Sequence, residues 1–187
     1  REEVALFSLP AILALPYGVV CLKERVKEFD NGSGRISLTQ LLADKRFHGG
    51  VLQERSYGEI TSIVKAGSDS SILRDLPPGA NTIQMLLQRH VDYIIEIPSF
   101  ITYQAKQQGE EGQFLSLAIE EYEAPVLVAH IFCTRGQWGE GFILQLNEII
   151  ERERGTEVYR EIIERWYDDN GRQVIREHYD QLTLGSN

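Results

Sequence analysis

Short apolar segments alternate with helix-length segments through the middle of the chain, and this order limits the fold more than any other feature. Residues 48–53 (HGGVLQ) and 91–97 (VDYIIEI) are typical of buried strands. Residues 56–67 and 98–109 instead have helical spacing, and Pro98 fits the first turn of the second helix. Strands separated by helices in this way predict βαβ units and a mainly parallel sheet, which places the chain in the α/β class.

The two ends of the chain add further elements to this pattern. Residues 16–22 (PYGVVCL) and 124–133 (APVLVAHIFC) are apolar and β-branched, and both predict strands. Residues 136–139 (GQWG) predict a turn. Residues 140–167 predict two helices with apolar faces, separated by a break at Gly155 and Thr156.

Charge and composition narrow the classes of function. The net charge is −9, from 28 acidic and 19 basic residues spread along the chain, and such a surface repels nucleic-acid phosphates. No run of about 18 apolar residues predicts a membrane span. The four histidines are isolated, with no metal-ligand spacing and no GxSxG elbow, so we expect no metal, no cofactor and no catalytic residues.

Several segments, taken in order, suggest a family. They are RxxxxxFSLP at the start, PYGVVCL, GGVLQERSYGEI (49–60), MLLQRHVDYIIE (85–96), and a return strand before two terminal helices. This order resembles the type II periplasmic solute-binding proteins, and most of all the amino-acid-binding, extracellular family 3 branch. The resemblance implies two α/β lobes joined by two crossover strands, with a ligand held between the lobes. It also implies a periplasmic location and delivery of ligand to the membrane subunits of an ABC transporter.

The resemblance also implies domain boundaries. Residues 1–23 would be a remnant of lobe 1 and the outgoing crossover (16–22), residues 24–125 would be lobe 2, and residues 126–187 would be the return crossover (126–133) and lobe 1 helices. The chain opens at Arg1 and its one methionine is Met85, so we expect that a signal peptide and half of lobe 1 precede Arg1. Cys21 and Cys133 would lie at opposite ends of antiparallel crossovers, and we expect free thiols.

Two places in lobe 2 are candidate ligand contacts. Open α/β sheets bind ligands at the carboxyl ends of their strands. The strand ending near Gln53 is followed by Arg55, Ser56, Tyr57 and Gly58, where a helix start could offer amides and a guanidinium to a carboxylate. The alternative is that Ser56 only caps its helix and that Arg55 is a solvated surface residue.

Glu96 ends the next strand, directly before the helix at Pro98. In the amino-acid-binding relatives an acidic residue near this point pairs with the ligand ammonium group, although the match needs a one-residue shift and the usual residue is aspartate. The alternative is a carboxylate that caps the following helix. Tyr17 and Tyr57 could form apolar walls with a polar edge, or could belong to the core. For Trp138 we favour a packing role over ligand stacking.

These residues predict a protein that binds an amino acid or a related small carboxylate without transforming it. Two alternatives share the fold. One is a ligand-sensing module of a signalling protein, and the other is a dehydratase-like enzyme.

Overall fold

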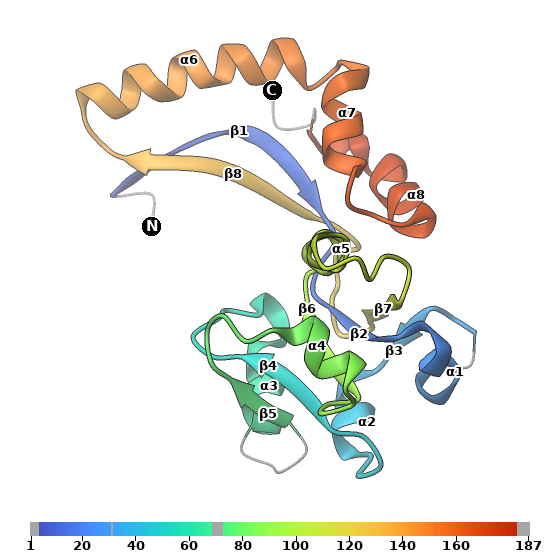
Figure 1. Ribbon diagram of the computed structural model, residues 1–187. Helices are drawn as coiled ribbons and strands as arrows, with labels where there is room; N and C mark the ends of the chain where they lie inside the picture. The colour runs from blue at the N-terminus through green and yellow to red at the C-terminus, as the bar shows by residue number, and fades with distance from the viewer. Residues whose placement is uncertain (1–3, 31, 69–72, 183–187) are drawn as a thin grey trace. The chain divides into compact units, whose positions relative to one another are not determined.

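The computed structural model of the protein describes residues 4–30, 32–68 and 73–182, so Arg1 lies outside the described residues. The chain forms two compact units. Unit 1 combines residues 1–15 with residues 125–187, and unit 2 comprises residues 16–124. The chain therefore leaves unit 1 once and returns to it once, as the colour order in Figure 1 shows.

A six-stranded sheet forms the centre of unit 2. Its strands are β2 (Gly18–Leu22), β3 (Arg35–Ile36), β4 (Gly49–Leu52), β5 (Leu73–Leu76), β6 (Tyr93–Glu96) and β7 (Phe114–Ile119). They lie in the order β3-β7-β2-β6-β4-β5. β4 is parallel to β5 and β6, and β3 is parallel to β7, whereas β2 is antiparallel to both β6 and β7. The α/β class is confirmed, and in the described part of this sheet only β2 opposes the common strand direction.

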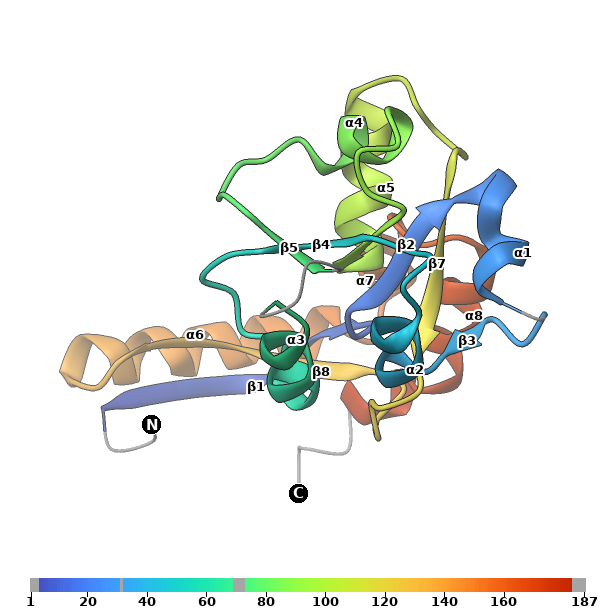
Figure 2. The ribbon, with the colours of Figure 1, turned by 90° about the horizontal axis from the view of Figure 1, so that it is seen from below.

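Helices cover both faces of this sheet. Helices α2 (Leu38–Ala43) and α3 (Thr61–Ser68) lie on one side, and α4 (Thr82–Leu87) and α5 (Pro98–Gln107) lie on the other (Figure 2). The short helix α1 (Val26–Phe29) follows β2. Ser37 caps α2, because its side chain accepts a hydrogen bond from the Gln40 amide.

Alternation of side chains along the strands gives each face its own core. Val19 and Ile95 join one buried cluster, whereas their neighbours Val20 and Ile94 join the other. The first cluster also contains Leu38, Leu41, Ile60 and Val64 from the side of α2 and α3, and the second contains Ile83, Leu86, Ile101 and Ala105 from α4 and α5. Each fully buried side chain of this size contributes about 1.5–3 kcal/mol, so the two clusters stabilise unit 2 from both sides.

The predicted pair of crossovers is wrong. Residues 18–22 form β2 and lie inside the unit 2 sheet, between β6 and β7. The strand β8 (Leu127–Thr134) pairs instead with β1 (Ala5–Ala14), antiparallel, from Ala5 opposite Thr134 to Ala14 opposite Leu127. Unit 2 therefore begins at residue 16 and not at residue 24. The sequence did not predict β1 because Pro10 lies inside this strand, and proline is rare within strands. The pairing register between β1 and β8 shifts on either side of Pro10.

Unit 1 contains the β1–β8 pair and helices α6 (Gln137–Glu153), α7 (Glu157–Glu164) and α8 (Asp169–Glu177). The predicted break at Gly155 and Thr156 is confirmed, and the Thr156 side chain caps α7 through the Tyr159 amide. The predicted turn at 136–139 is wrong, because Gln137 already begins α6. A side chain on Gly139 would lie 2.3 Å from the Thr134 carbonyl oxygen, so this glycine allows α6 to start close against β8.

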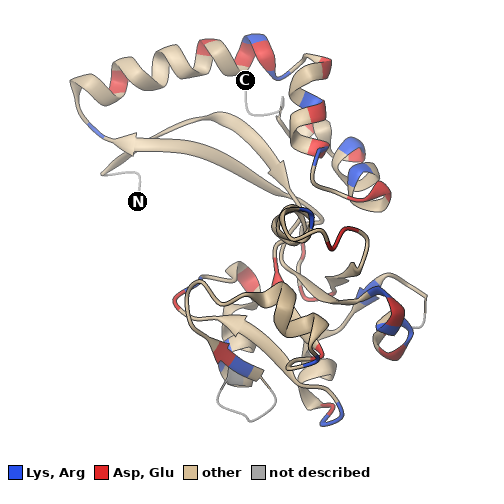
Figure 3. Cartoon of the chain, viewed as in Figure 1, with Lys and Arg blue, Asp and Glu red and all other residues tan. Residues whose placement is uncertain are grey.

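Much of the apolar surface of unit 1 is exposed. β1 and β8 carry no Asp, Glu, Lys or Arg side chains, whereas α6, α7 and α8 carry both acidic and basic ones (Figure 3). Phe132 is 68% exposed and Trp138 is 71% exposed. Trp138 stacks on Phe142 with ring centroids 5.3 Å apart, a packing contact within α6. Cys21 and Cys133 are both free thiols, as predicted.

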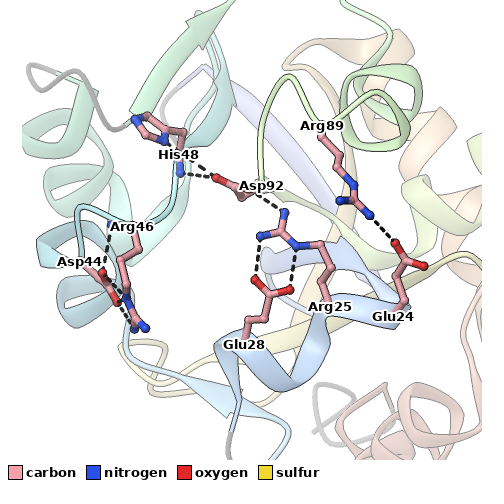
Figure 4. A network of polar contacts seen from close by, with 8 residues as sticks. All are labelled: Glu24, Arg25, Glu28, Asp44, Arg46, His48, Arg89 and Asp92. Atoms are coloured by element: carbon pink, nitrogen blue, oxygen red, sulfur yellow. Dashed lines mark hydrogen bonds and ion pairs between the residues drawn. The ribbon is translucent and has the colours of Figure 1, made fainter.

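A polar network joins the amino ends of β4 and β6 (Figure 4). Asp92, directly before β6, accepts a 2.6 Å hydrogen bond from Arg25 and a 2.8 Å hydrogen bond from the main-chain amide of His48, directly before β4. Arg25 also pairs with Glu28 on α1. These contacts fix the relative position of the two strands at this end of the sheet, and the candidate site lies at the other end.

Candidate ligand-binding site

The carboxyl ends of β4 and β6 bring Arg55 and Glu96 together. The two strands are parallel neighbours, so the residues that follow them meet at one edge of the sheet. The Arg55 Nη1 atom lies 2.5 Å from the Glu96 Oε1 atom. The sequence predicted both residues for this edge, but as separate contacts for opposite charges of a ligand. In the structure they form an ion pair with each other.

Glu96 is a buried carboxylate, only 1% exposed. Its Oε1 atom accepts the bond from Arg55 and a 2.9 Å hydrogen bond from the Ile97 amide, directly before α5. This bond supports the alternative prediction for Glu96, that its carboxylate caps the helix that follows. The Oε2 atom is also buried and has no hydrogen-bond partner among the described residues. A buried acceptor without a donor is rare in folded proteins, and a functional role is one of its known explanations.

Arg55 is held from several sides but is not enclosed. Its guanidinium lies over the Phe100 ring of α5, 5.6 Å from the ring centroid, and 33% of the side chain is exposed. The Tyr17 side chain also lies near its positive charge. Burial raises the pKa of Tyr17, and the positive charge of Arg55 opposes that rise. Arg55 is therefore a preorganised cation that remains partly open to solvent. The alternative prediction, that Arg55 is a solvated surface residue, does not fit these contacts.

Tyr17 and Tyr57 contact each other, with ring centroids 4.7 Å apart. Tyr57 is 3% exposed and belongs to the core, because its hydroxyl donates to the Leu52 carbonyl oxygen and accepts from the Leu52 amide. Burial raises the pKa of Tyr57 to about 12. Tyr17 is half-buried and lies beside the guanidinium, so of the two rings Tyr17 is the one that borders the site.

The helix start predicted at Ser56 is wrong. A 3₁₀ turn spans Gly58–Ile60, Tyr57 occupies the N-cap position, and α3 begins at Thr61. The Tyr57 amide donates to the Thr61 hydroxyl oxygen at 3.1 Å, so it is not available to a ligand. Ser56 is exposed and caps nothing, while Gly58 adopts φ +59° to start the turn.

Two further residues shape this site, and neither was among the predicted contacts. Phe100 lies one turn beyond Glu96, in the first turn of α5, and its position after Pro98 was a usable signal. Tyr122 donates a 2.7 Å hydrogen bond to the Tyr57 carbonyl oxygen across 65 positions of sequence, and no local pattern indicates such a contact.

Two further observations concern membrane spans and metal sites in the described residues. Across residues 4–30, 32–68 and 73–182, no helix has the length and apolar character that crossing a membrane requires. In the same ranges, His, Cys, Asp and Glu side chains form no group of three or more that could bind a metal ion.

No protein-family model matches the sequence, and no curated protein matches it either. Solved structures do match in fold. The fold is that of the type II solute-binding proteins. An ancestral cationic amino-acid solute-binding protein has a TM-score of 0.59 and 13% identity, and the match covers 90% of this chain and 64% of that one.

Two further structures extend this comparison. An amino-acid ABC transporter substrate-binding protein from Streptococcus pneumoniae, with L-arginine bound, has a TM-score of 0.57 and 17% identity, covering 93% of this chain and 63% of that one. The ligand-binding core of GluR0 with L-glutamate has a TM-score of 0.55 and 15% identity, covering 89% and 65%. This chain therefore spans a little less than two thirds of the length of the structures that it resembles.

Proposed function

We propose that this chain is a solute-binding protein that captures an amino acid or a related small carboxylate and delivers it, unaltered, to an ABC transporter. The fold supports this proposal, because it is the fold of proteins whose names describe amino-acid binding. The observation that carries it is the pairing of Arg55 with the buried Glu96 at the carboxyl ends of β4 and β6. A charged pair at this edge, with one open guanidinium face, suits a small charged ligand.

The location and partners follow from the same proposal. We propose that the protein acts in the periplasm, where its partners are the membrane subunits of a transporter. A second candidate function is ligand sensing, and the observation that favours it is the similarity to the GluR0 ligand-binding core. The two functions share one ligand site and differ in what the chain is joined to. A full-length gene that encodes a membrane-anchored signalling domain would select sensing over transport.

A thermal-shift screen of the 187-residue protein against amino acids and small carboxylates tests the proposal. A ligand that binds only the folded protein raises the midpoint of unfolding as its concentration exceeds Kd. We expect at least one compound to stabilise the protein and to be recovered unaltered by chromatography. Stabilisation by no compound would overturn the binding function, and consumption of the stabilising compound would show an enzyme instead.

Two variants link the screen to the site. Glu96→Gln removes the charge that holds Arg55 and should abolish the shift. Glu24→Gln is the matched control, because Glu24 pairs with Arg89 on the surface, where both side chains are more than 60% exposed. An unchanged shift in the Glu96 variant would remove Glu96 from the site.

A further inference from the structure

The two charged groups of the site differ in how open they are. Glu96 is 1% exposed and is paired with the guanidinium, whereas the Arg55 side chain is 33% exposed. An incoming ligand therefore meets the guanidinium first. The Oε2 atom of Glu96 is buried and has no hydrogen-bond partner among the described residues, so a ligand ammonium group could reach it only if neighbouring side chains moved. Moving Arg55 would break its ion pair with a buried carboxylate, which is costly.

We propose that Arg55 is the ligand-contacting charge of unit 2, that it receives a carboxylate group of the ligand, and that Glu96 is a positioning residue for Arg55. This inference rests on the proposed function and specifies the chemistry of its site. The expected ligand class is one with a free carboxylate, and an ammonium group is not required for contact with unit 2.

The surroundings of Arg55 support a fixed receptor for a planar anion. The Glu96 carboxylate binds one terminal nitrogen, Nη1, and the Phe100 ring lies against the flat guanidinium. Tyr17, directly before β2, lies near the guanidinium as well. A guanidinium that is already oriented loses little conformational entropy when a carboxylate binds to it by two parallel hydrogen bonds.

Three small compounds test separately the contributions of the carboxylate and the ammonium group of an amino acid to binding. L-alanine has both charged groups, propanoate has the carboxylate alone, and ethylamine has the ammonium group alone. The readout is the ¹H–¹⁵N signal of the Arg55 side-chain Nε in the 187-residue protein, titrated with each probe. We expect alanine and propanoate to shift this signal with dissociation constants that agree within about tenfold. We expect ethylamine to leave it unchanged.

Variants then test the two roles. Arg55→Lys keeps the positive charge but loses the planar fork, and it should weaken propanoate binding by about tenfold or more, measured by calorimetry or by amide shifts. In the Glu96→Gln variant, the direction of the change in propanoate affinity shows whether Glu96 positions Arg55. If Glu96 acted only through its charge, its removal would strengthen the binding of an anion. As a positioning residue, its loss should weaken propanoate binding, while Glu24→Gln leaves it unchanged.

The opposite outcomes overturn the inference in distinguishable ways. If ethylamine binds and shifts the Glu96 and Ile97 amides while propanoate has no effect, Glu96 receives an ammonium group and the inference is wrong, although the proposed function stands. Stronger propanoate binding in the Glu96→Gln variant would also reject the positioning role. If neither the probes nor any compound of the thermal-shift screen binds, both the inference and the proposed function fail.

Discussion

The Tyr122 hydroxyl donates a 2.7 Å hydrogen bond to the main-chain carbonyl oxygen of Tyr57, inside unit 2. Tyr57 lies two residues after Arg55, so this bond fixes the loop that carries the candidate site. Burial raises the pKa of Tyr122 far above its ordinary value, and the hydroxyl therefore remains protonated and able to donate.

Replacing Tyr122 by phenylalanine should destabilise the protein. The ring and its packing remain, but the Tyr57 carbonyl oxygen loses its donor, which costs about 1–3 kcal/mol in the free energy of unfolding. Tyr93→Phe is the matched control, because the Tyr93 hydroxyl is buried without a partner among the described residues. Urea denaturation should show a loss for the first variant and none for the second. Equal losses would contradict the account of this bond.

Glu121 should make the stability of the protein depend on pH. Burial alone would raise the pKa of this carboxyl group, but hydrogen bonds from the Thr39 and Leu38 amides and from Ser37 outweigh burial and lower it. A lowered pKa in the folded state stabilises the fold above the ordinary glutamate pKa, and that contribution is lost as the pH falls through the lowered value.

The Glu121→Gln variant measures this contribution. At neutral pH it should lose about 1 kcal/mol in the free energy of unfolding, because the carboxylate caps the start of α2. The difference from the unchanged protein should shrink as the pH falls below about 4, where the carboxylate becomes protonated. A difference that stays constant down to acidic pH would show that the charge of Glu121 is not the cause.

Asp92 should matter more for stability than a surface acid of the same charge. Its carboxylate binds both the Arg25 guanidinium and the His48 amide and is 21% exposed, so Asp92→Ala removes the acceptor of the His48 amide and leaves Arg25 with Glu28 alone. We expect a loss of about 2 kcal/mol. Glu24→Ala, which breaks only the exposed pair with Arg89, should cost less than about 0.5 kcal/mol. Similar losses in urea denaturation would mean that the network in Figure 4 does not support the sheet.

β8 should open more readily than β2. β2 lies between two strands and all five of its residues are buried, whereas β8 pairs with β1 alone in the described sheet and its side chains are largely exposed. The surface beside β8 includes an apolar groove of about 340 Å³ lined by Ile131, Ile149 and Val158 among others. Hydrogen exchange followed by mass spectrometry should show faster exchange for β8 amides. Equal protection of the two strands would indicate that something covers β8 in solution.

Local patterns were sufficient to predict β2, β4, β6, α3 and α5 of unit 2, but not β3, β5 or β7. Apolar runs with β-branched residues predicted β2, β4 and β6, and helical spacing predicted α3 and α5. The proximity of Arg55 and Glu96 followed from one rule, that parallel neighbouring strands end at the same edge of a sheet.

The predictions that were wrong concern contacts between residues far apart in the sequence. The partner of β8 could not be read from its own residues, and Pro10 made β1 an unlikely strand on local grounds. The turn predicted at 136–139 became the start of α6 because Gly139 permits a close approach to β8. The Arg55–Glu96 ion pair also went unrecognised, since sequence shows which charges share an edge but not whether they bind each other.

Amide shift mapping of the 187-residue protein, titrated with the most stabilising compound of the thermal-shift screen, locates the ligand site. We expect ¹H–¹⁵N shift changes at residues 55–58 and at Glu96 and Ile97, with little change at His48 and Asp92 at the opposite end of the sheet. Changes confined to that opposite end, or to unit 1, would contradict a ligand site at the carboxyl ends of β4 and β6.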